Sequence, residues 1–269
     1  MINLDHAATT ACDPGAVQAM LPWFSEAYGN PSTMYSIGAA AAKAVRHARE
    51  QIAQTLGTGP EEIFFTSGGT ESDNWALKGI AQSLGTKGHH LITTKIEHPA
   101  VLESCAFLEK NGYEITYLDV DSRGQISLPQ LEEAIRPDTI LISVMYANNE
   151  IGTVEPVRQI AETAHRHGIL FHTDAVQAYG QIPISTQEDG IDLLSASGHK
   201  FYGPNGTGFL YVRKGIAMER FMHGGSQERG RRAGTENVPG IVGIGMAAEL
   251  AGASLEARMQ NERKLQKYL

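Results

Sequence analysis

Short apolar runs alternate with longer segments of helical pattern along most of the chain, and this alternation limits the fold more than any other feature. Runs rich in Ile, Val, Leu or Phe and bounded by turn residues predict strands at 62–65, 90–94, 114–118, 139–144, 169–172, 193–196 and 208–212. The helical pattern predicts helices between them at 38–56, 70–84, 100–111, 128–135 and 156–167. Four glycines occupy C-cap positions behind these helices: Gly57, Gly85, Gly112 and Gly168. The pattern predicts an α/β fold, a three-layer αβα sandwich with a mostly parallel central sheet.

Polar clusters follow five of the predicted strands. In parallel sheets the ligand binds beyond the carboxyl ends of the strands, so these clusters are expected to meet at one site. They are the segment 66–70 (TSGGT), Glu97 with His98, the segment 148–150 (NNE), Asp174 with Gln177, and Ser197 with His199 and Lys200.

Lys200 lies in the segment SASGHKFYGP at 195–204, directly after an apolar run. A buried amine among hydroxyls, an imidazole and backbone amides suits a covalent bond to the aldehyde of a phosphorylated cofactor. The alternative is an ordinary lysine in a Gly-rich turn, and the segment alone favours that interpretation. The other motifs of the chain reverse the preference.

The segment TSGGTES at 66–72 joins a predicted strand to a predicted helix. Its glycines let the backbone approach an anion, and a helix start offers unpaired N–H groups. We therefore predict a phosphate site that includes Gly69 and Thr70, although an ordinary capping turn is the alternative. Thr70 is expected to cap the helix in either case. The segment matches neither the Walker A loop nor the dinucleotide fingerprint, which weakens the hypothesis of a nucleotide-binding domain.

Four further polar residues admit two interpretations each. A carboxylate at the end of a buried strand, such as Asp174, needs a cationic or N–H partner, and the alternative is a helix N-cap. His98 precedes a proline that starts a helix; its ring is suited to stacking and proton exchange, but a structural role is the commoner one. Asn149 and Gln177 are neutral donors that are equally at home in turns.

The loop that carries Arg229, Arg231, Arg232 and Thr235 is basic and Gly-rich. Three arginines so close together repel one another unless an anion or carboxylates hold them. We interpret the cluster as an anion or subunit contact, with a solvated loop as the alternative.

Composition excludes several classes of function. The net charge of −8 argues against nucleic acid as a partner. The N-terminal residues lack a signal-peptide pattern, and no apolar run is expected to approach the length of a membrane span, so a cytoplasmic location is expected. The two cysteines, Cys12 and Cys105, have no metal-ligand spacing and form no disulfide framework. We expect no metal site.

Taken together, the segments resemble the cysteine desulfurases, a branch of the class V aminotransferase family of enzymes that depend on pyridoxal 5'-phosphate (PLP) and share fold type I. The matching segments are LDHAATT (4–10), GNPS (29–32), FTSGGTESDN (65–74), EH (97–98), ANNEIG (147–152), HTDAVQ (172–177), SGHKFYGP (197–204) and QERGRRAGT (227–235). They stand in the order of the family and span nearly the whole chain.

The resemblance implies a role for each site residue. Lys200 resembles the lysine that holds PLP covalently, Asp174 the partner of the pyridine nitrogen, and His98 the histidine that stacks on the ring and exchanges protons. Gln177 matches the donor to the ring oxygen, with Asn149 nearby. Four residues match the phosphate site, namely Gly69, Thr70, Ser197 and His199. Thr235 matches a residue that reaches the phosphate of the other subunit, which implies a homodimer.

The implied reaction converts L-cysteine to L-alanine and leaves sulfur as a persulfide on an enzyme thiol, for iron–sulfur cluster or other sulfur-cofactor synthesis through an acceptor or scaffold protein. Neither Cys12 nor Cys105 matches the acceptor cysteine of the family, and the arginine for the substrate carboxylate is also unmatched. We therefore expect a truncated form that lacks most of the C-terminal domain, binds PLP and turns over little cysteine alone. The expected divisions are an N-terminal segment associated with the small domain (1–13), the PLP-binding major domain (14–250) and the start of a helix toward the missing domain (251–269).

Two alternatives stay open. One is a selenocysteine lyase or another class V enzyme that acts on a small amino acid. The other is an inactive PLP-binding or scaffold subunit that pairs with a full-length partner.

Overall fold

The computed structural model describes residues 5–268. The first four residues of the predicted N-terminal segment 1–13, and Leu269 at the end of the predicted segment 251–269, lie outside the described residues.

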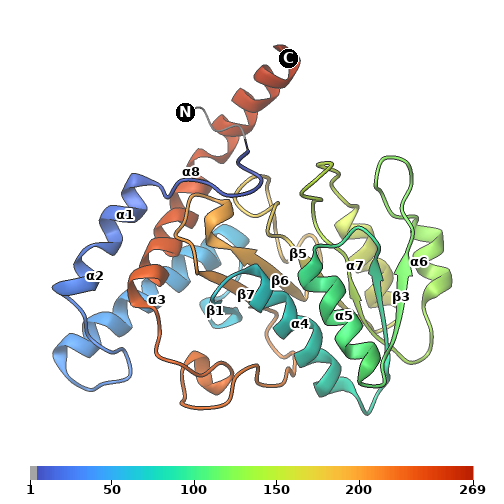
Figure 1. The fold of residues 1–269 in the computed structure, drawn as a ribbon, viewed down its shortest axis with the longest axis horizontal. Coiled ribbons are helices and arrows are strands. Elements are labelled where there is room, and N and C mark those ends of the chain that lie inside the picture. Colours follow the sequence, from blue (N-terminus) through green and yellow to red (C-terminus); the bar gives the residue numbers. More distant parts are fainter. Residues whose placement is uncertain (1–4, 269) are drawn as a thin grey trace.

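Within the described residues, seven strands form one sheet in the order β1-β7-β6-β5-β4-β2-β3 (Figure 1). Both pairs that β7 makes are antiparallel, whereas the other pairs are parallel. The mostly parallel sheet is therefore confirmed, and each predicted strand is present with changes only at its ends. The strands are β1 (Ile63–Thr66), β2 (His90–Thr94), β3 (Glu114–Leu118), β4 (Thr139–Ser143), β5 (Leu170–Asp174), β6 (Leu193–Ser197) and β7 (Gly208–Val212).

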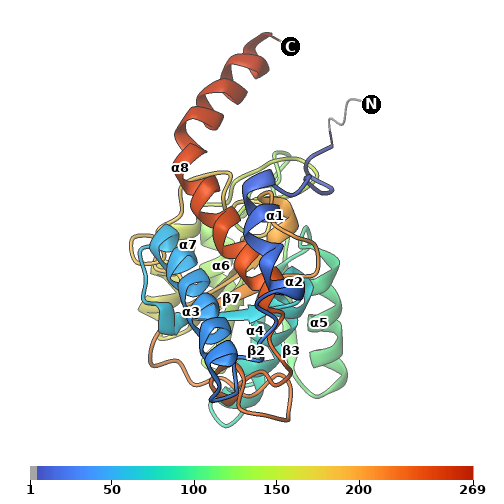
Figure 2. The ribbon, with the colours of Figure 1, turned by 90° about the vertical axis from the view of Figure 1, so that its left-hand side faces the viewer.

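Helices cover both faces of the sheet. Consecutive side chains of a strand point to opposite faces, so neighbouring residues of one strand pack against different helices. Leu91, Leu141 and Leu193 belong to one hydrophobic cluster with α4 (Gly69–Leu84) and α5 (Pro99–Lys110). Their neighbours in sequence, Ile92, Ile142 and Leu194, belong to a second cluster on the other face. That cluster includes side chains of α3 (Ser36–Leu56), α7 (Val157–Arg166) and α8 (Val238–Tyr268). The predicted three-layer αβα sandwich is thus confirmed (Figures 1 and 2).

All five predicted helices are present. They are α3, α4, α5 and α7, named above, and α6 (Leu128–Ala134). Gly57, Gly112 and Gly168 adopt positive φ values of 66°, 88° and 69° behind their helices, as expected of C-cap glycines. Gly85 is an exception, since its φ of −59° is right-handed. Gly85 is nevertheless the C-cap of α4, as predicted.

Three helices differ from prediction. The short helices α1 (Pro14–Met20) and α2 (Pro22–Ser25) were not predicted. Helix α8 starts at Val238, earlier than the segment read as helical, and runs without a break across the predicted boundary at 250. Its last turns project beyond the sheet (Figure 2). The domain division itself stays a prediction.

Helix α8 also corrects the expectation about apolar segments. It contains an 18-residue window with a mean hydropathy of 1.5, long enough to cross a membrane, although half of that window is buried inside the fold. The helix packs against α3 and α1. Such burial is typical of a core helix in a globular domain.

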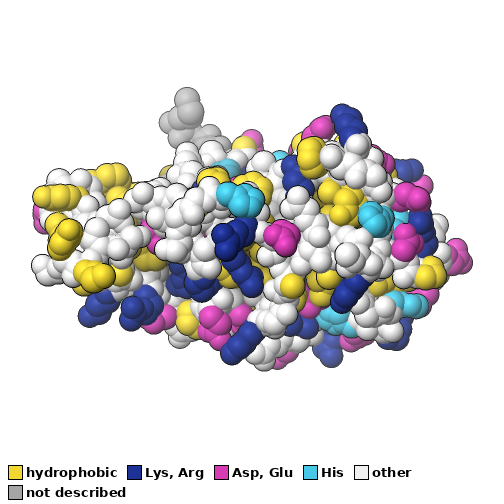
Figure 3. All heavy atoms as spheres, turned by 90° about the horizontal axis from the view of Figure 1, so that it is seen from below, with side chains coloured by type: hydrophobic (Ala, Val, Ile, Leu, Met, Phe, Trp, Pro, Cys, Tyr) yellow, Lys and Arg dark blue, Asp and Glu magenta, His cyan; other side chains and the backbone are white. Residues whose placement is uncertain are grey.

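Large apolar side chains are exposed at the end of the molecule that α1, α2 and the loop after them form. Figure 3 shows hydrophobic side chains gathered at this end, and charges of both signs mixed over the rest of the visible face. We call these residues the apolar end: Leu21, Phe24, Tyr28, Met34 and Tyr35.

Candidate active site

A cavity of about 360 Å³ lies at the carboxyl ends of the strands. It brings together nine of the ten predicted site residues: Gly69, Thr70, His98, Asn149, Asp174, Gln177, Ser197, His199 and Lys200. Because β7 is antiparallel to both neighbours, β1 points the same way as β6 and contributes its end to the same edge. The expectation that the polar strand ends meet is therefore confirmed for these nine.

Lys200 ends a short 3-10 helix, η2 (Gly198–Lys200), directly after β6. It is half-buried rather than buried. Its Nζ donates hydrogen bonds to the carbonyl oxygens of Ala7 and Ala8, the latter at 3.0 Å. Burial lowers the pKa of Lys200, while the carboxylates of Asp174 and Asp5 oppose this effect. The amine is thus held at the cavity by backbone groups from the start of the chain.

The N-terminal segment forms one wall of the cavity, which the sequence did not predict. Asp5, Ala7 and Ala8 line it. The backbone N–H of Thr10 donates to the carbonyl of His199 at 2.9 Å, and the His199 ring pairs through Nδ1 with the Thr9 hydroxyl at 3.0 Å. These bonds fix the segment across the loop that carries Lys200.

Asp174 is the last residue of β5 and is 5% exposed. Burial raises its pKa, whereas the N–H of Val176, which donates to Oδ1 at 2.9 Å, and the nearby His98 and Lys200 lower it. The residues that follow form turns. Asp174 is therefore a buried carboxylate facing a cavity, and the alternative of a helix N-cap is wrong.

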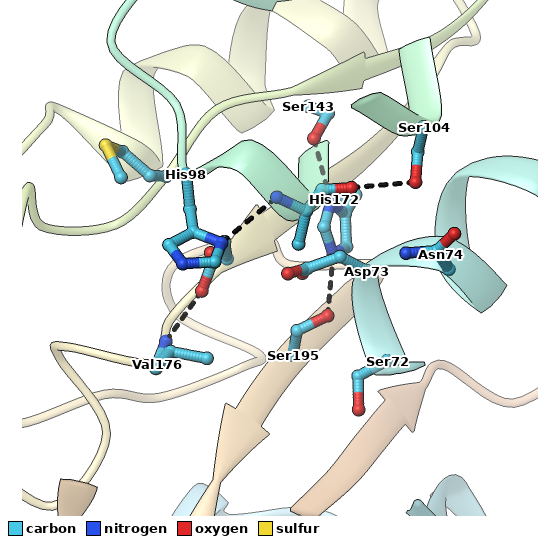
Figure 4. Close-up of polar contacts among 12 residues, drawn as sticks. Ser72, Asp73, Asn74, His98, Ser104, Ser143, His172, Val176 and Ser195 are labelled. Atoms are coloured by element: carbon cyan, nitrogen blue, oxygen red, sulfur yellow. Dashed lines mark hydrogen bonds and ion pairs between the residues drawn. The ribbon is translucent and has the colours of Figure 1, made fainter. Parts of the chain in front are cut away.

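His98 lines the cavity and is also the N-cap of α5. Its Nδ1 accepts a hydrogen bond from the N–H of Ala100 at 3.1 Å (Figure 4). The structural interpretation of this histidine therefore holds, and its position on the cavity leaves the ring-stacking role open.

The two predicted amide donors have partners within the chain. Gln177 donates from Nε2 to the carbonyl of Ala7 at 2.9 Å, and Asn149 donates from Nδ2 to the carboxylate of Glu150 at 2.8 Å. Both residues still line the cavity.

The predicted phosphate segment opens α4. Gly68, not Thr70, is the N-cap, and no side chain of residues 5–268 caps the helix. The expectation that Thr70 caps α4 was wrong. Gly68 has a φ of 155° and a ψ of −177°, a conformation that essentially only glycine adopts. Backbone N–H groups at a helix start that no side chain caps are typical of an anion site.

The basic loop uses its arginines within the fold. Arg232 donates to both carboxylate oxygens of Glu71, from Nε at 2.8 Å and from Nη2 at 3.2 Å. Arg229 lies over the ring of Phe64 and donates to the carbonyl of Ile63 at 2.7 Å. Protein groups therefore hold Arg229 and Arg232 in place of an external anion.

Thr235 does not line the main cavity. It lies on a separate hollow of about 270 Å³ beside Trp23 and Tyr28. Thr235 is exposed, and it is the one predicted site residue that the structure leaves apart from the others.

Sequence reasoning missed a second buried carboxylate of the cavity, Asp73 on α4, which is 1% exposed. Its helical spacing from Ala76 and Ile80, which are also buried, places it on the buried stripe of the helix. A charged residue on such a stripe is the signal that would have identified it. The described residues contain no group of three or more potential metal ligands.

Comparison with known proteins identifies the family to which this fold and this cavity belong. The chain belongs to the aminotransferase class-V family, which matches residues 2–269, and within it to the cysteine desulfurases. Members of this family are PLP-dependent.

Three relatives illustrate the similarity. The cysteine desulfurase IscS of Methanosarcina thermophila is 54% identical over 268 residues, which are 100% of this chain and 66% of that protein. A solved structure of a NifS-like protein has a TM-score of 0.96 and 43% identity, covering 98% of this chain and 73% of that one. The structure of SspA in complex with cysteine has a TM-score of 0.90 and 46% identity, covering 93% and 72%. The chain thus spans about two thirds of the length of the curated relatives.

Proposed function

We propose that this chain is the PLP-binding part of a cysteine desulfurase, which converts L-cysteine to L-alanine and passes sulfur to a thiol. The single observation that carries the proposal is that the amine of Lys200 and the buried carboxylate of Asp174 line one cavity. The identity to curated cysteine desulfurases and the cysteine complex of the similar SspA support the choice of substrate.

The residues of the cavity fit PLP. The start of α4, which has no side-chain cap, suits a phosphate. A Cβ added at Gly69 would lie 2.5 Å from Cγ2 of Val176, so only glycine fits there without displacing a residue of the cavity wall. Asp174 suits a protonated ring nitrogen, and Lys200 suits the aldehyde. When bound, PLP supplies an electron sink for bond cleavage at the substrate.

The chain itself contributes binding, orientation and proton transfer. The carboxylate of Asp174 would attract a positively charged part of a bound molecule to one end of the cavity, because a buried carboxylate is stabilised by a cation. Lys200 can give up or take a proton at Nζ, since burial has already lowered its pKa. His98 presents its Nε2 as a second proton carrier, because Nδ1 is engaged with Ala100.

Borohydride reduction of the PLP-loaded chain, followed by peptide mass mapping, tests the anchor. We expect a phosphopyridoxyl group on Lys200 and none on the Lys200→Arg variant. The exposed Lys214 provides a matched control, since Lys214→Arg should leave the modification intact. A folded chain that is modified elsewhere, or not at all, would contradict the proposal.

Neither cysteine of the chain suits the sulfur-accepting role. Burial raises the pKa of the Cys105 thiol to about 12, and burial and Asp13 raise that of Cys12. Only a thiolate accepts sulfur as a nucleophile, and neither residue lines the cavity. We expect little sulfide from the purified chain given cysteine and a reductant, and robust release would contradict this.

We also propose that the chain forms a homodimer in which Thr235 serves the partner's phosphate site. Thr235 is exposed beside the apolar end, a surface of the kind that subunits bury. Sedimentation of the purified chain should give a dimer, and Phe24→Glu, at a side chain that is 63% exposed, should shift it toward monomer. A monomeric unmodified chain would contradict the dimer. Because the relatives are cysteine desulfurases, we also propose that the protein passes sulfur to an acceptor protein and that it is located in the cytoplasm.

A further inference from the structure

Asp73 is a buried carboxylate that lines the cavity. It lies on α4 beside His172, and its carboxylate is directed toward the side where His98 lies (Figure 4). Its Oδ1 is 3.7 Å from Nε2 of His172 and, within residues 5–268, makes no hydrogen bond. A carboxylate in this position is costly unless it is paired or neutral.

His172 cannot supply the missing charge. Its ring is fully buried, and both nitrogens have hydroxyl partners: Nδ1 with Ser143 at 2.9 Å and Nε2 with Ser195 at 3.0 Å. Burial lowers the pKa of His172 to about 3, so the ring is neutral at ordinary pH. Asp73 therefore faces a neutral group on this side.

The charged groups that act on Asp73 are two further carboxylates, Asp174 and Glu97. Burial raises the pKa of Asp73 well above its usual range, and Asp174 and Glu97 raise it further, whereas a contact with the Ser195 hydroxyl lowers it only in part. Glu97 is itself buried and accepts from the Thr94 hydroxyl and the N–H of Met145. Burial raises the pKa of Glu97 to about 8.

Asp174 has more partners that stabilise its negative charge than Asp73 has. It accepts the N–H of Val176, and His98 and Lys200 stabilise its charge. Two carboxylates that interact in a buried site do not both ionise readily, and the one with better partners keeps the charge.

We propose that Asp73 is a positioning residue that carries the proton of the Asp73–Asp174 pair and thereby keeps Asp174 ionised toward the cavity. The protonation of the pair is a property of this chain alone. Its consequence, a permanent anion for the ring nitrogen, rests on the proposed function.

Infrared spectroscopy of the protein without PLP tests where the proton lies. At about pH 7 the protonated-carboxyl band should lose intensity in Asp73→Asn and keep it in Asp174→Asn. An unchanged band in Asp73→Asn together with a loss in Asp174→Asn would overturn the proposal. Should Asp73→Asn fail to fold, carboxyl carbon shifts of ¹³C-aspartate decide the matter: one aspartate should stay protonated at about pH 7 both in the unmodified protein and in Asp174→Asn, and loss of that signal in Asp174→Asn would overturn the proposal.

A pH titration of the PLP-loaded protein tests the consequence. Asp73→Asn should shift the pH dependence of the cofactor absorbance, whereas Glu155→Gln should not. Glu155 is a matched control because burial raises its pKa too, yet it does not line the cavity. An unshifted titration in Asp73→Asn would overturn the positioning role. Failure to bind PLP at all would instead count against the proposed function, while the infrared result would still locate the proton.

Discussion

His98 performs a structural task at the same position where a chemical one is proposed. Replacing it with Ala removes the N-cap of α5 and should lower the free energy of unfolding by about 1 kcal/mol. His98→Asn should restore most of that stability, because Asn is a good N-cap. Both variants should perturb the absorbance of bound PLP, since neither has a ring to stack. Thermal melts and absorbance spectra separate the two tasks; normal spectra in both variants would confine His98 to capping.

At the level of residues, the sequence revealed groups that follow strands and concealed groups that lie within elements. Lys200 and Asp174 could be found because a polar residue at the end of an apolar run is visible in the pattern. Asp73 was overlooked because it lies inside the predicted helix 70–84, directly after the segment that was predicted to bind an anion. The wall formed by Ala7 and Ala8 acts through backbone carbonyls, which leave no trace in side-chain chemistry.

At the level of elements, a buried ion pair fastens the basic loop to the sheet. Arg49 on α3 and Glu228 at the start of η3 (Glu228–Gly230) are joined at 2.8 Å, with side chains 11% and 3% exposed. Glu228 also accepts the N–H of Phe65 at 3.0 Å. Its φ of 44° and that of Arg229, 57°, are uncommon for residues other than glycine. The pair therefore holds the loop before Thr235 in a conformation it would not adopt by itself.

Breaking this pair should be costly. Glu228→Ala leaves a buried arginine without its partner and should lower the free energy of unfolding by about 3–5 kcal/mol. The exposed pair of Lys214 and Glu61, 3.6 Å apart, offers a comparison, and Glu61→Ala should cost less than about 1 kcal/mol. Denaturant unfolding measures both changes. Equal effects would show that the buried pair does not stabilise the loop.

The elements that sequence reasoning missed have physical reasons. Helices α1 and α2 span 7 and 4 residues, too few for a periodic pattern to stand out. The start of α8 is rich in glycine, which is a poor helix former. Yet a Cβ added at Gly245 would lie 2.6 Å from Cα of Ala48 on α3. Close packing of two helices, invisible in a single sequence, explains the glycine there.

At the level of the whole molecule, several buried acids make stability depend on pH. Burial raises the pKa values of four carboxyl groups: Asp73, Asp174, Glu97 and Glu155. The pKa of Glu97 is raised to about 8. At these four carboxyl groups the folded chain therefore binds more protons than the unfolded chain once the pH exceeds their ordinary pKa values. The stability that these groups contribute is complete at low pH and is lost as the pH rises through their folded pKa values.

We therefore expect the melting temperature of the protein without PLP to fall between about pH 6 and pH 9. His90, His172 and His199 act in the opposite sense, because their lowered pKa values cost stability only as the pH falls below the ordinary histidine range. Calorimetry across this range provides the measurement. A melting temperature that stays level or rises toward pH 9 would show that the buried acids are ionised in the fold.

The wall formed by the first described residues has a consequence for biosynthesis. Thr9 pairs with His199, 190 positions later in the chain. Translation proceeds at roughly 5–20 residues per second, so the opening segment leaves the ribosome about 10–40 s before its partners exist. Completion of this pocket is thereby a late event for a nascent chain, however early the central strands pair.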